Sequence, residues 1–182
     1  MVISMVLLAL ISIAGFSQEK YYTKSGKVSF YSKAPLEDIE AQNKNAVSVF
    51  DKSTGQVEVS ILMKAFEFEK SLMQEHFNEN YVESDKFPKS VFKGTITGLP
   101  EADFTKNGKY STTVSGKLTL HGETKDIIAP ATFIINNGMI SVISEFKMTL
   151  EDYKISIPSI VKDKIGREVK IVIEINYELL KR

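Results

Sequence analysis

Two histidines, His76 and His121, are the only imidazoles in this chain of 182 residues, and they limit the chemistry that its side chains can support. A metal site built from histidines would have at most two ligands, and the absence of cysteine excludes thiol catalysis, iron–sulfur clusters and thiolate zinc sites. A serine hydrolase would need an activated serine beside one imidazole, and no G-x-S-x-G sequence is present to supply it. His76 falls on an apolar stripe, where a hydrogen-bonded core histidine is commoner than a ligand, and His121 precedes a glycine whose turn it is expected to shape.

Carboxylates are abundant, but their positions single out no site. Glu145, Glu151, Asp152 and Asp163 can form pairs of the kind used in acid–base catalysis, yet 23 acidic residues among 23 basic ones offer such pairs in any arrangement. The net charge of zero gives no basic footprint for nucleic acid or for an anionic membrane. Phosphate loops, dinucleotide fingerprints and haem-attachment motifs are also missing from the sequence. We therefore predict a protein without an enzymatic activity, a metal or a cofactor.

Strands with one apolar face must position the remaining side chains. Glycine supplies the positive φ of tight hairpins, and the glycine pairs that separate apolar segments are Thr54-Gly55, Asn107-Gly108, His121-Gly122, Asn137-Gly138 and Ile165-Gly166. Apolar and polar residues alternate between these turns, most clearly from Val169 to Leu179. Further strands are expected at residues 28–32, 39–42, 47–50, 57–63, 90–97, 110–120, 127–135 and 140–150.

About eight hairpin-linked strands predict an all-β protein, an antiparallel up-and-down (lipocalin-like) β-barrel, because closure removes exposed strand edges. A two-sheet sandwich remains the alternative, since periodicity does not separate the two. A barrel of this size either just fills with its own side chains or holds one elongated apolar ligand, and both outcomes stay open. The chain has 11 Phe, 7 Tyr and 6 Met, and Met and Phe adapt well to a flexible hydrocarbon tail.

One segment between the strands has helical spacing instead. Strand parity slips near Ala65, which predicts a bulge or bend, and Ser71 with Gln74 has the spacing of a capping box. Phe87-Pro88 then forces extended backbone into the next strand. We expect one short amphipathic helix to lie across an open end or flank of the barrel. Its apolar stripe consists of Leu72, Met73, His76, Phe77 and Tyr81.

The N-terminal segment has the outline of a secretory signal peptide. No side chain from Met1 to Phe16 is charged, and the small residues Gly15 and Ser17 precede a cleavage point before Gln18. A retained membrane anchor is the competing interpretation, but the apolar run is shorter than the ~20 residues that a spanning helix needs. We expect cleavage after residue 17, a single domain over residues 18–182, a periplasmic or secreted location, and no stable membrane insertion afterwards.

Several motifs follow one another in an order and spacing that cover nearly all of residues 18–182. They are Phe66-Glu67-Phe68, His76-Phe77, Ser84–Pro88, Phe92-Lys93-Gly94, Val114–Lys125, Leu150–Tyr153 and the closing strand from Glu168. In these motifs the chain resembles the YceI-like family of bacterial envelope proteins, whose barrels are associated with lipid and polyisoprenoid binding. One departure is that Thr149–Lys154 keeps the Asp-aromatic pair of a common family element but lacks its Arg and Gly, so this element supports no inference about a ligand head group.

The resemblance implies a barrel with a cavity that holds a polyisoprenoid or fatty-acyl lipid by sequestration or transport, without bond making. His76 or Tyr153 is then expected to meet a polar head. Two alternatives remain. One is an envelope stress or interaction module with a filled core, and the other is an enzyme that acts on a lipidic substrate with His76 as its base. A homodimer is also possible. The side chains expected to line the cavity are Phe30, Phe66, Phe68, Met73, His76, Phe77, Tyr81, Phe92, Phe133, Phe146, Tyr153 and Ile173.

Overall fold

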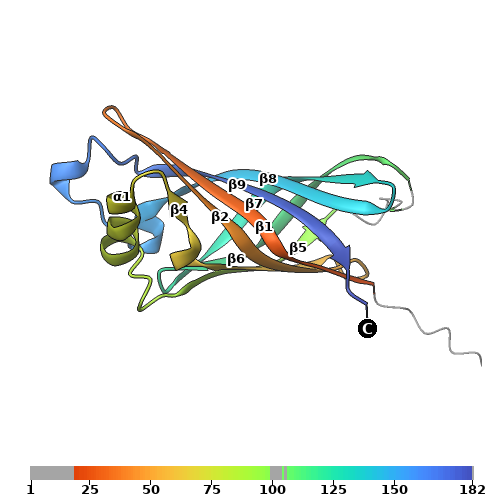
Figure 1. Ribbon diagram of the computed structural model, residues 1–182. Coiled ribbons are helices and arrows are strands. Elements are labelled where there is room, and N and C mark those ends of the chain that lie inside the picture. The colour runs from red at the N-terminus through yellow and green to blue at the C-terminus, as the bar shows by residue number, and fades with distance from the viewer. Residues whose placement is uncertain (1–18, 99–103, 105, 182) are drawn as a thin grey trace, which may run out of the picture.

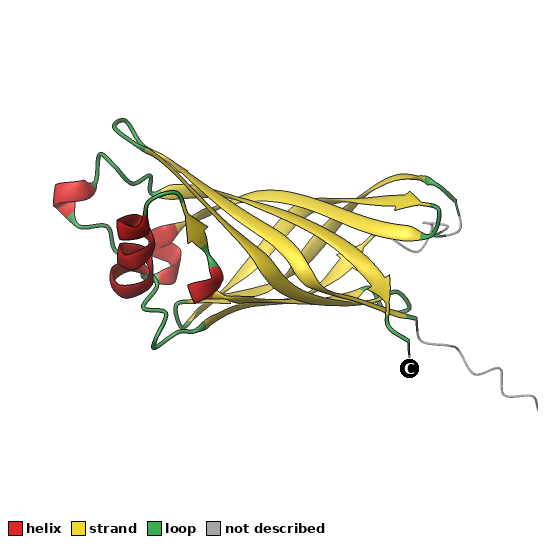
Figure 2. Ribbon diagram, viewed as in Figure 1, coloured by secondary structure: helices red, strands yellow, loops and turns green. Residues whose placement is uncertain are grey.

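The computed structural model describes residues 19–98, 104 and 106–181, and the expected signal peptide lies outside the described residues. Strands dominate these residues and close into an antiparallel barrel, with helical segments gathered at one end (Figures 1 and 2). The predicted single short helix and the up-and-down order are both confirmed. The strands are β1 (Lys20–Lys33), β2 (Asp38–Asp51), β3 (Gln56–Leu62), β4 (Glu67–Phe68), β5 (Lys89–Thr97), β6 (Gly108–Leu120), β7 (Glu123–Asn136), β8 (Met139–Thr149) and β9 (Glu168–Leu179).

Eight of these strands form the closed barrel. The hydrogen-bonded order is β1-β9-β8-β7-β6-β5-β3-β2, and β2 pairs back to β1, so the barrel strands have no free edge. The two-residue β4 adds beside β2 at the helical end. All pairings between the described strands are antiparallel, and their unbroken circuit through β1 and β2 excludes the two-sheet sandwich.

The strand β2 runs unbroken through the region for which two separate strands were predicted, residues 39–42 and 47–50. Ala41 and Asn43 are buried, but Ala46, one residue out of phase with that alternation, is buried as well. The β1–β2 register shifts on both sides of Gly26, which pairs with Ala46. Asn43 is buried without cost because its side-chain amide donates to the carbonyl of Leu62 at 2.9 Å. A bulge therefore absorbs the polar run that had suggested a strand end.

Two hairpins have the tight turns that their sequences predict. His121 and Gly122 connect β6 to β7 with φ of 50° and 77°, and Asn137 and Gly138 connect β7 to β8 with φ of 50° and 79°. Positive φ at both central residues is the turn that matches the right-handed twist of the flanking strands.

The helical segment follows a short 3-10 turn at Met63–Ala65, which makes the bend predicted near Ala65. Helix α1 spans Ser71–His76 and continues as a π-helical turn, η2, over Phe77–Tyr81. The predicted capping box is wrong, because Lys70 is the N-cap residue and no side chain caps the helix. Gln74 instead accepts a hydrogen bond from the backbone N–H of Phe68 at 3.2 Å, which ties the helix to β4.

Two further 3-10 turns, η3 (Leu150–Tyr153) and η4 (Ser159–Val161), lie between β8 and β9 at the same end as α1 (Figure 1). The buried apolar residues separate into two clusters. One cluster lies near α1 and includes Met63, Phe66 and Tyr153, and the other includes Phe50 and Phe133 and packs the opposite end. Ile61 and Ile173 are partly buried and pack against both clusters.

Candidate functional site

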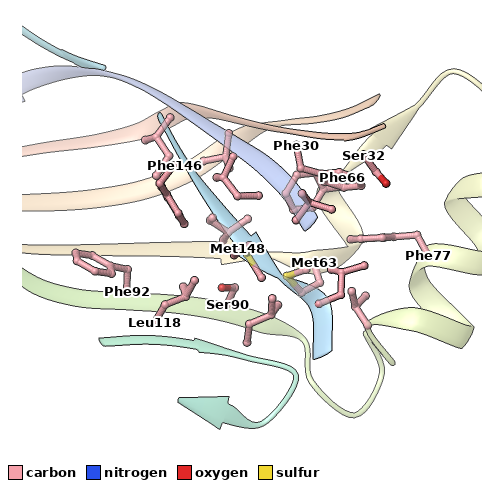
Figure 3. A pocket seen from close by; sticks show the side chains of 18 of the residues that line it. Phe30, Ser32, Met63, Phe66, Phe77, Ser90, Phe92, Leu118, Phe146 and Met148 are labelled. Carbon is pink, nitrogen blue, oxygen red and sulfur yellow. The ribbon is translucent and has the colours of Figure 1, made fainter. Parts of the chain in front are cut away.

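The barrel encloses a cavity of about 500 Å³, within the range of small-molecule sites. Figure 3 shows its walls, with Phe92, Leu118 and Phe146 on one side of the view and Phe77 reaching in from the helix on the other. Phe92, Leu118, Phe146 and Ile173 point inward from four strands, yet each stays partly exposed. Side chains in a filled core would cover one another at near-crystalline density. The interior is thus a hollow with an apolar wall.

Polar groups inside the wall are already engaged with the backbone. The hydroxyl of Ser90 donates to the carbonyl of Thr119 at 3.1 Å, and the hydroxyl of Ser144 donates to the carbonyl of Pro130 at 2.8 Å. Both serines are buried and contribute to the cavity wall. Because their protons are used, the middle of the cavity offers a ligand contact surface but few hydrogen-bond donors.

Charged side chains line the cavity where it reaches the surface. They are Glu37, Lys70 and Lys164, and exposed Leu72 and His76 of α1 lie at the same opening. Lys70 Nζ lies 2.8 Å from Glu37 Oε1, and this hydrogen bond, more than the charge of Lys70 itself, lowers the pKa of Glu37. The pair joins the β1–β2 hairpin to the start of α1 across the opening. Exposed pairs of this kind contribute little to stability, so the link can open readily.

The helical segment is held over the barrel by a cluster of four phenylalanine rings. The ring centroid of Phe77, on η2, lies 5.5 Å from that of Phe30, 5.6 Å from that of Phe66 and 5.0 Å from that of Phe68. Aromatic pairs at such distances stabilise by about 0.5–1.5 kcal/mol each beyond simple burial. Phe30 on β1, Phe68 on β4 and Phe66 just before β4 thus hold one helical side chain, which places α1 and η2 as a cover on this end of the cavity.

The opposite end of the cavity is closed by tightly packed aromatic side chains. Phe50 and Phe133 are fully buried with ring centroids 5.5 Å apart, and Tyr177 lies 5.9 Å from Phe50. The hydroxyl of Ser48 donates its one proton to the carbonyl of Glu58 at 3.0 Å. The Tyr177 hydroxyl, 2.7 Å from Ser48 Oγ, is therefore the donor in the hydrogen bond between these two side chains. Burial raises the pKa of Tyr177 to about 12. Among the described residues, these packed side chains form a plug at this end of the cavity.

The structure places the predicted site residues around this cavity, with Tyr153 as the exception. Phe30, Phe66, Phe68, Met73, His76, Phe77, Tyr81, Phe92, Phe133, Phe146 and Ile173 all contribute to its wall or its opening. Their role in binding a ligand stays a prediction. His76 lies at the opening and is exposed, so it is not the core histidine that its apolar stripe suggested.

Tyr153 lies outside the cavity wall and supports the loops beneath it. Its side chain is buried, its hydroxyl has no hydrogen-bond partner among the described residues, and burial raises its pKa to about 12. Its carbonyl accepts a hydrogen bond from His121 Nδ1 at 2.9 Å, and His121 Nε2 lies 2.7 Å from Glu83 Oε2. The Phe87 ring contacts the imidazole edge-to-face at 4.8 Å. His121 therefore shapes its turn, as expected, and also joins three loops.

Sequence reasoning emphasised aromatic residues and missed most of the aliphatic wall. Strand periodicity could have predicted part of this wall. Ile61, Leu118 and Ile171 lie on the same strand faces as residues that were predicted to point inward. Ile39 and Val161, at the opening, belong to segments without clear alternation. No signal in the sequence distinguished them.

Comparisons with known proteins give one family and several similar structures. The profile of the YceI-like domain matches residues 21–177, and no curated protein matches the chain. A polyisoprenoid binding domain from Saccharophagus degradans implicated in plant cell wall breakdown is 11% identical with a TM-score of 0.77, over 90% of this chain and 99% of that chain. BcnA of Burkholderia cenocepacia is 19% identical with a TM-score of 0.69, over 84% and 96%. The YCEI protein of Campylobacter jejuni is 19% identical with a TM-score of 0.59, over 78% and 85%. At these identities the likeness shows the fold alone.

Proposed function

The chain belongs to the YceI-like domain family, and from this we propose that it holds a polyisoprenoid or another long-chain lipid in its barrel cavity. The lipid is sequestered or carried without bond making. The observation that carries the proposal is the hollow apolar interior, whose inward side chains remain partly exposed. A similar solved structure is a polyisoprenoid binding domain, which agrees with a ligand of this class.

Burial of hydrocarbon supplies the binding energy in this proposal. Each methylene transferred from water to the wall contributes about 0.8 kcal/mol, so a tail of several carbons binds tightly without a charged contact. Phe92, Leu118, Phe146 and Ile173 are the side chains with apolar surface left to cover. Covering this surface stabilises the loaded protein as well as the tail.

The lipid enters with its tail toward the aromatic plug and its head at the α1 end. The plug of Phe50 and Phe133 leaves no route at the far end, whereas Lys70, His76 and Lys164 stand at the opening. A phosphate or other polar head placed there stays partly hydrated and meets cationic or imidazole groups. Tyr153, which is buried away from the opening, is not part of the proposed head-group site.

We also propose export, followed by action in the periplasm or outside the cell. The support is the apolar segment at residues 1–17 of the sequence. Among the described residues, none of the helices has the length and apolar character needed to cross a membrane.

Mass spectrometry of lipids extracted from protein purified without denaturation tests the proposal. We expect a stoichiometric hydrophobe in the wild type and its loss or sharp reduction in Phe146→Ala. The matched control is Ile143→Ala, on the same strand β8 but with an outward side chain that is 42% exposed, and it should retain the lipid. Folded protein that carries no hydrophobe would overturn the proposal.

A residual enzymatic role is tested with the same material. His76→Gln keeps the size of the side chain but removes the imidazole that could act as a base. We expect the bound lipid to be chemically identical in wild type and variant. Lipid that accumulates in a modified form only in the presence of His76 would show that the barrel catalyses a reaction.

A further inference from the structure

The end of the barrel that carries α1 exposes three large apolar side chains. Leu36, in the β1–β2 hairpin, is 71% exposed, Leu72, in α1, is 59% exposed, and Ile160, in η4, is 89% exposed. Figure 1 shows that the hairpin, α1 and η4 all lie at this end. Single exposed leucine and isoleucine side chains are ordinary on protein surfaces. Here three separate segments present them at the same end of the barrel. We call Leu36, Leu72 and Ile160 the apolar rim.

The apolar rim surrounds the opening of the cavity. The backbone N–H of Leu36 donates to the carbonyl of Asp163 at 3.0 Å, which joins the hairpin to the η4 loop. The Glu37–Lys70 pair joins the same hairpin to the start of α1. Leu72 itself lines the cavity, as does Val161, the neighbour of Ile160. Leu72 and Val161 therefore connect the apolar rim to the barrel interior, beside the charged side chains of the opening.

The charges beside the rim are mixed. Lys162 and Lys164 flank Asp163, and Lys70 is paired with Glu37. This arrangement creates no strong field of either sign, so attraction to an anionic surface is weak. Lysines next to apolar tips can keep their ammonium groups at the head-group level while their stems lie along apolar surface.

We propose that the apolar rim docks the barrel on the surface of a lipid bilayer, with the cavity opening facing the membrane, and this inference rests on the proposed lipid-binding function. A long hydrocarbon tail that moves between the cavity and a bilayer would be exposed to water if the opening stood away from the membrane. If the rim is seated in the head-group region, the tail passes from the bilayer into the cavity with little exposure to water. A bilayer is the occupant that accounts for both the apolar tips and their position around a lipid-sized opening.

Vesicle flotation with delipidated full-length mature protein tests the docking. We expect the wild type to float with phosphatidylcholine vesicles, and to do so at high salt because the contact is apolar. Leu36→Ser and Ile160→Ser should each weaken the association by about tenfold, since each removes one large side chain from the contact. Ile128→Ser is the matched control, because Ile128 is 77% exposed on strand β7 away from the opening. A wild type that does not float, or an equal loss in the control, would overturn the proposal.

Two readouts separate this inference from the proposed function. Lipid retention, measured by mass spectrometry, should be unchanged in Leu36→Ser and Ile160→Ser, since neither side chain lines the cavity. A wild type that retains lipid but never floats overturns docking alone, and one that floats but carries no lipid overturns the proposed function. Sedimentation gives the remaining outcome. If the rim substitutions abolish a dimer while vesicle binding is absent, the occupant is a second copy of the chain and the bilayer proposal fails.

Discussion

Substitution of two neighbouring inward residues by phenylalanine distinguishes a hollow barrel from a filled one. Ile173 and Ile175 lie on β9 with the same orientation, and both contribute to the cavity wall. Ile175 is 3% exposed and packs within the cluster that forms the plug, whereas Ile173 is partly exposed between the two clusters. We predict opposite signs for the change in the free energy of unfolding.

The magnitudes follow from the space around each side chain. Ile175→Phe adds volume within the buried cluster that contains Phe50 and Tyr177, so it should lower the free energy of unfolding by about 1–3 kcal/mol. Ile173→Phe places its ring toward the cavity, beside Ser144, its small register partner on β8. If it covers roughly 40 Å² more apolar surface at about 25 cal/mol per Å², it raises the free energy of unfolding by about 1 kcal/mol.

Denaturant unfolding of delipidated protein measures both values, because a bound lipid would stabilise the wild type and mask the difference. The Ile173→Phe variant should also take up less lipid, since its ring occupies part of the volume of about 500 Å³. If Ile173→Phe destabilises the protein as much as Ile175→Phe does, the interior is already filled and the reasoning fails.

Three further predictions concern the plug, the cover and the barrel wall. Burial raises the pKa of Tyr177 from 10 to about 12, so the unfolded chain loses its proton first and the wild type should lose about 2–3 kcal/mol of unfolding free energy as the pH rises from about 10 to about 12. Tyr177→Phe should lack this part of the decline in denaturant titrations, and equal slopes would contradict the assignment. Phe77→Ala should detach the helical cover, with faster hydrogen exchange in residues 71–81 and a cost of about 2–3 kcal/mol, and unchanged exchange would show that the aromatic cluster does not hold it. Gly116→Ala should destabilise by about 1–3 kcal/mol in thermal or denaturant unfolding, because its Cβ would collide with the carbonyl oxygen of Lys93 and with Gly94, whereas outward Ser115→Ala should be tolerated.

Strand periodicity and turn chemistry predicted hairpin-linked antiparallel strands, but they left both a barrel and a two-sheet sandwich open. The alternation from Val169 to Leu179 and the Asn137-Gly138 turn are local properties of backbone and side chain, and the structure follows them. Closure could be inferred because an open sheet would leave edges unpaired. The inward direction of Phe92 and Phe146 followed from the same period.

The details that failed depend on contacts between distant segments. Gln74 has the spacing of a capping box, but the backbone of Phe68 lies within its reach and takes its side-chain oxygen. The polar run at Asn43 looked like a strand end because its partner, the carbonyl of Leu62, is 19 residues away in the sequence. Tyr153 was expected at the cavity, to meet a polar head, although the turn η3 directs it into the packed loops. Contacts between distant segments determine these details, and the local sequence does not show which segments come into contact.

The closed ring of strand pairings in the barrel implies an order in which the strands of this protein pair during folding. Strand β1 pairs with β9, so that Tyr21 lies opposite Leu179, and the barrel closes only when the last strand of the chain is present. The hairpins from β5 to β8 can form from neighbouring segments, but this final pairing brings together opposite ends of the chain and makes folding slow. Until that step, β1 and β9 each present an unpaired edge, which can pair with a strand of another chain.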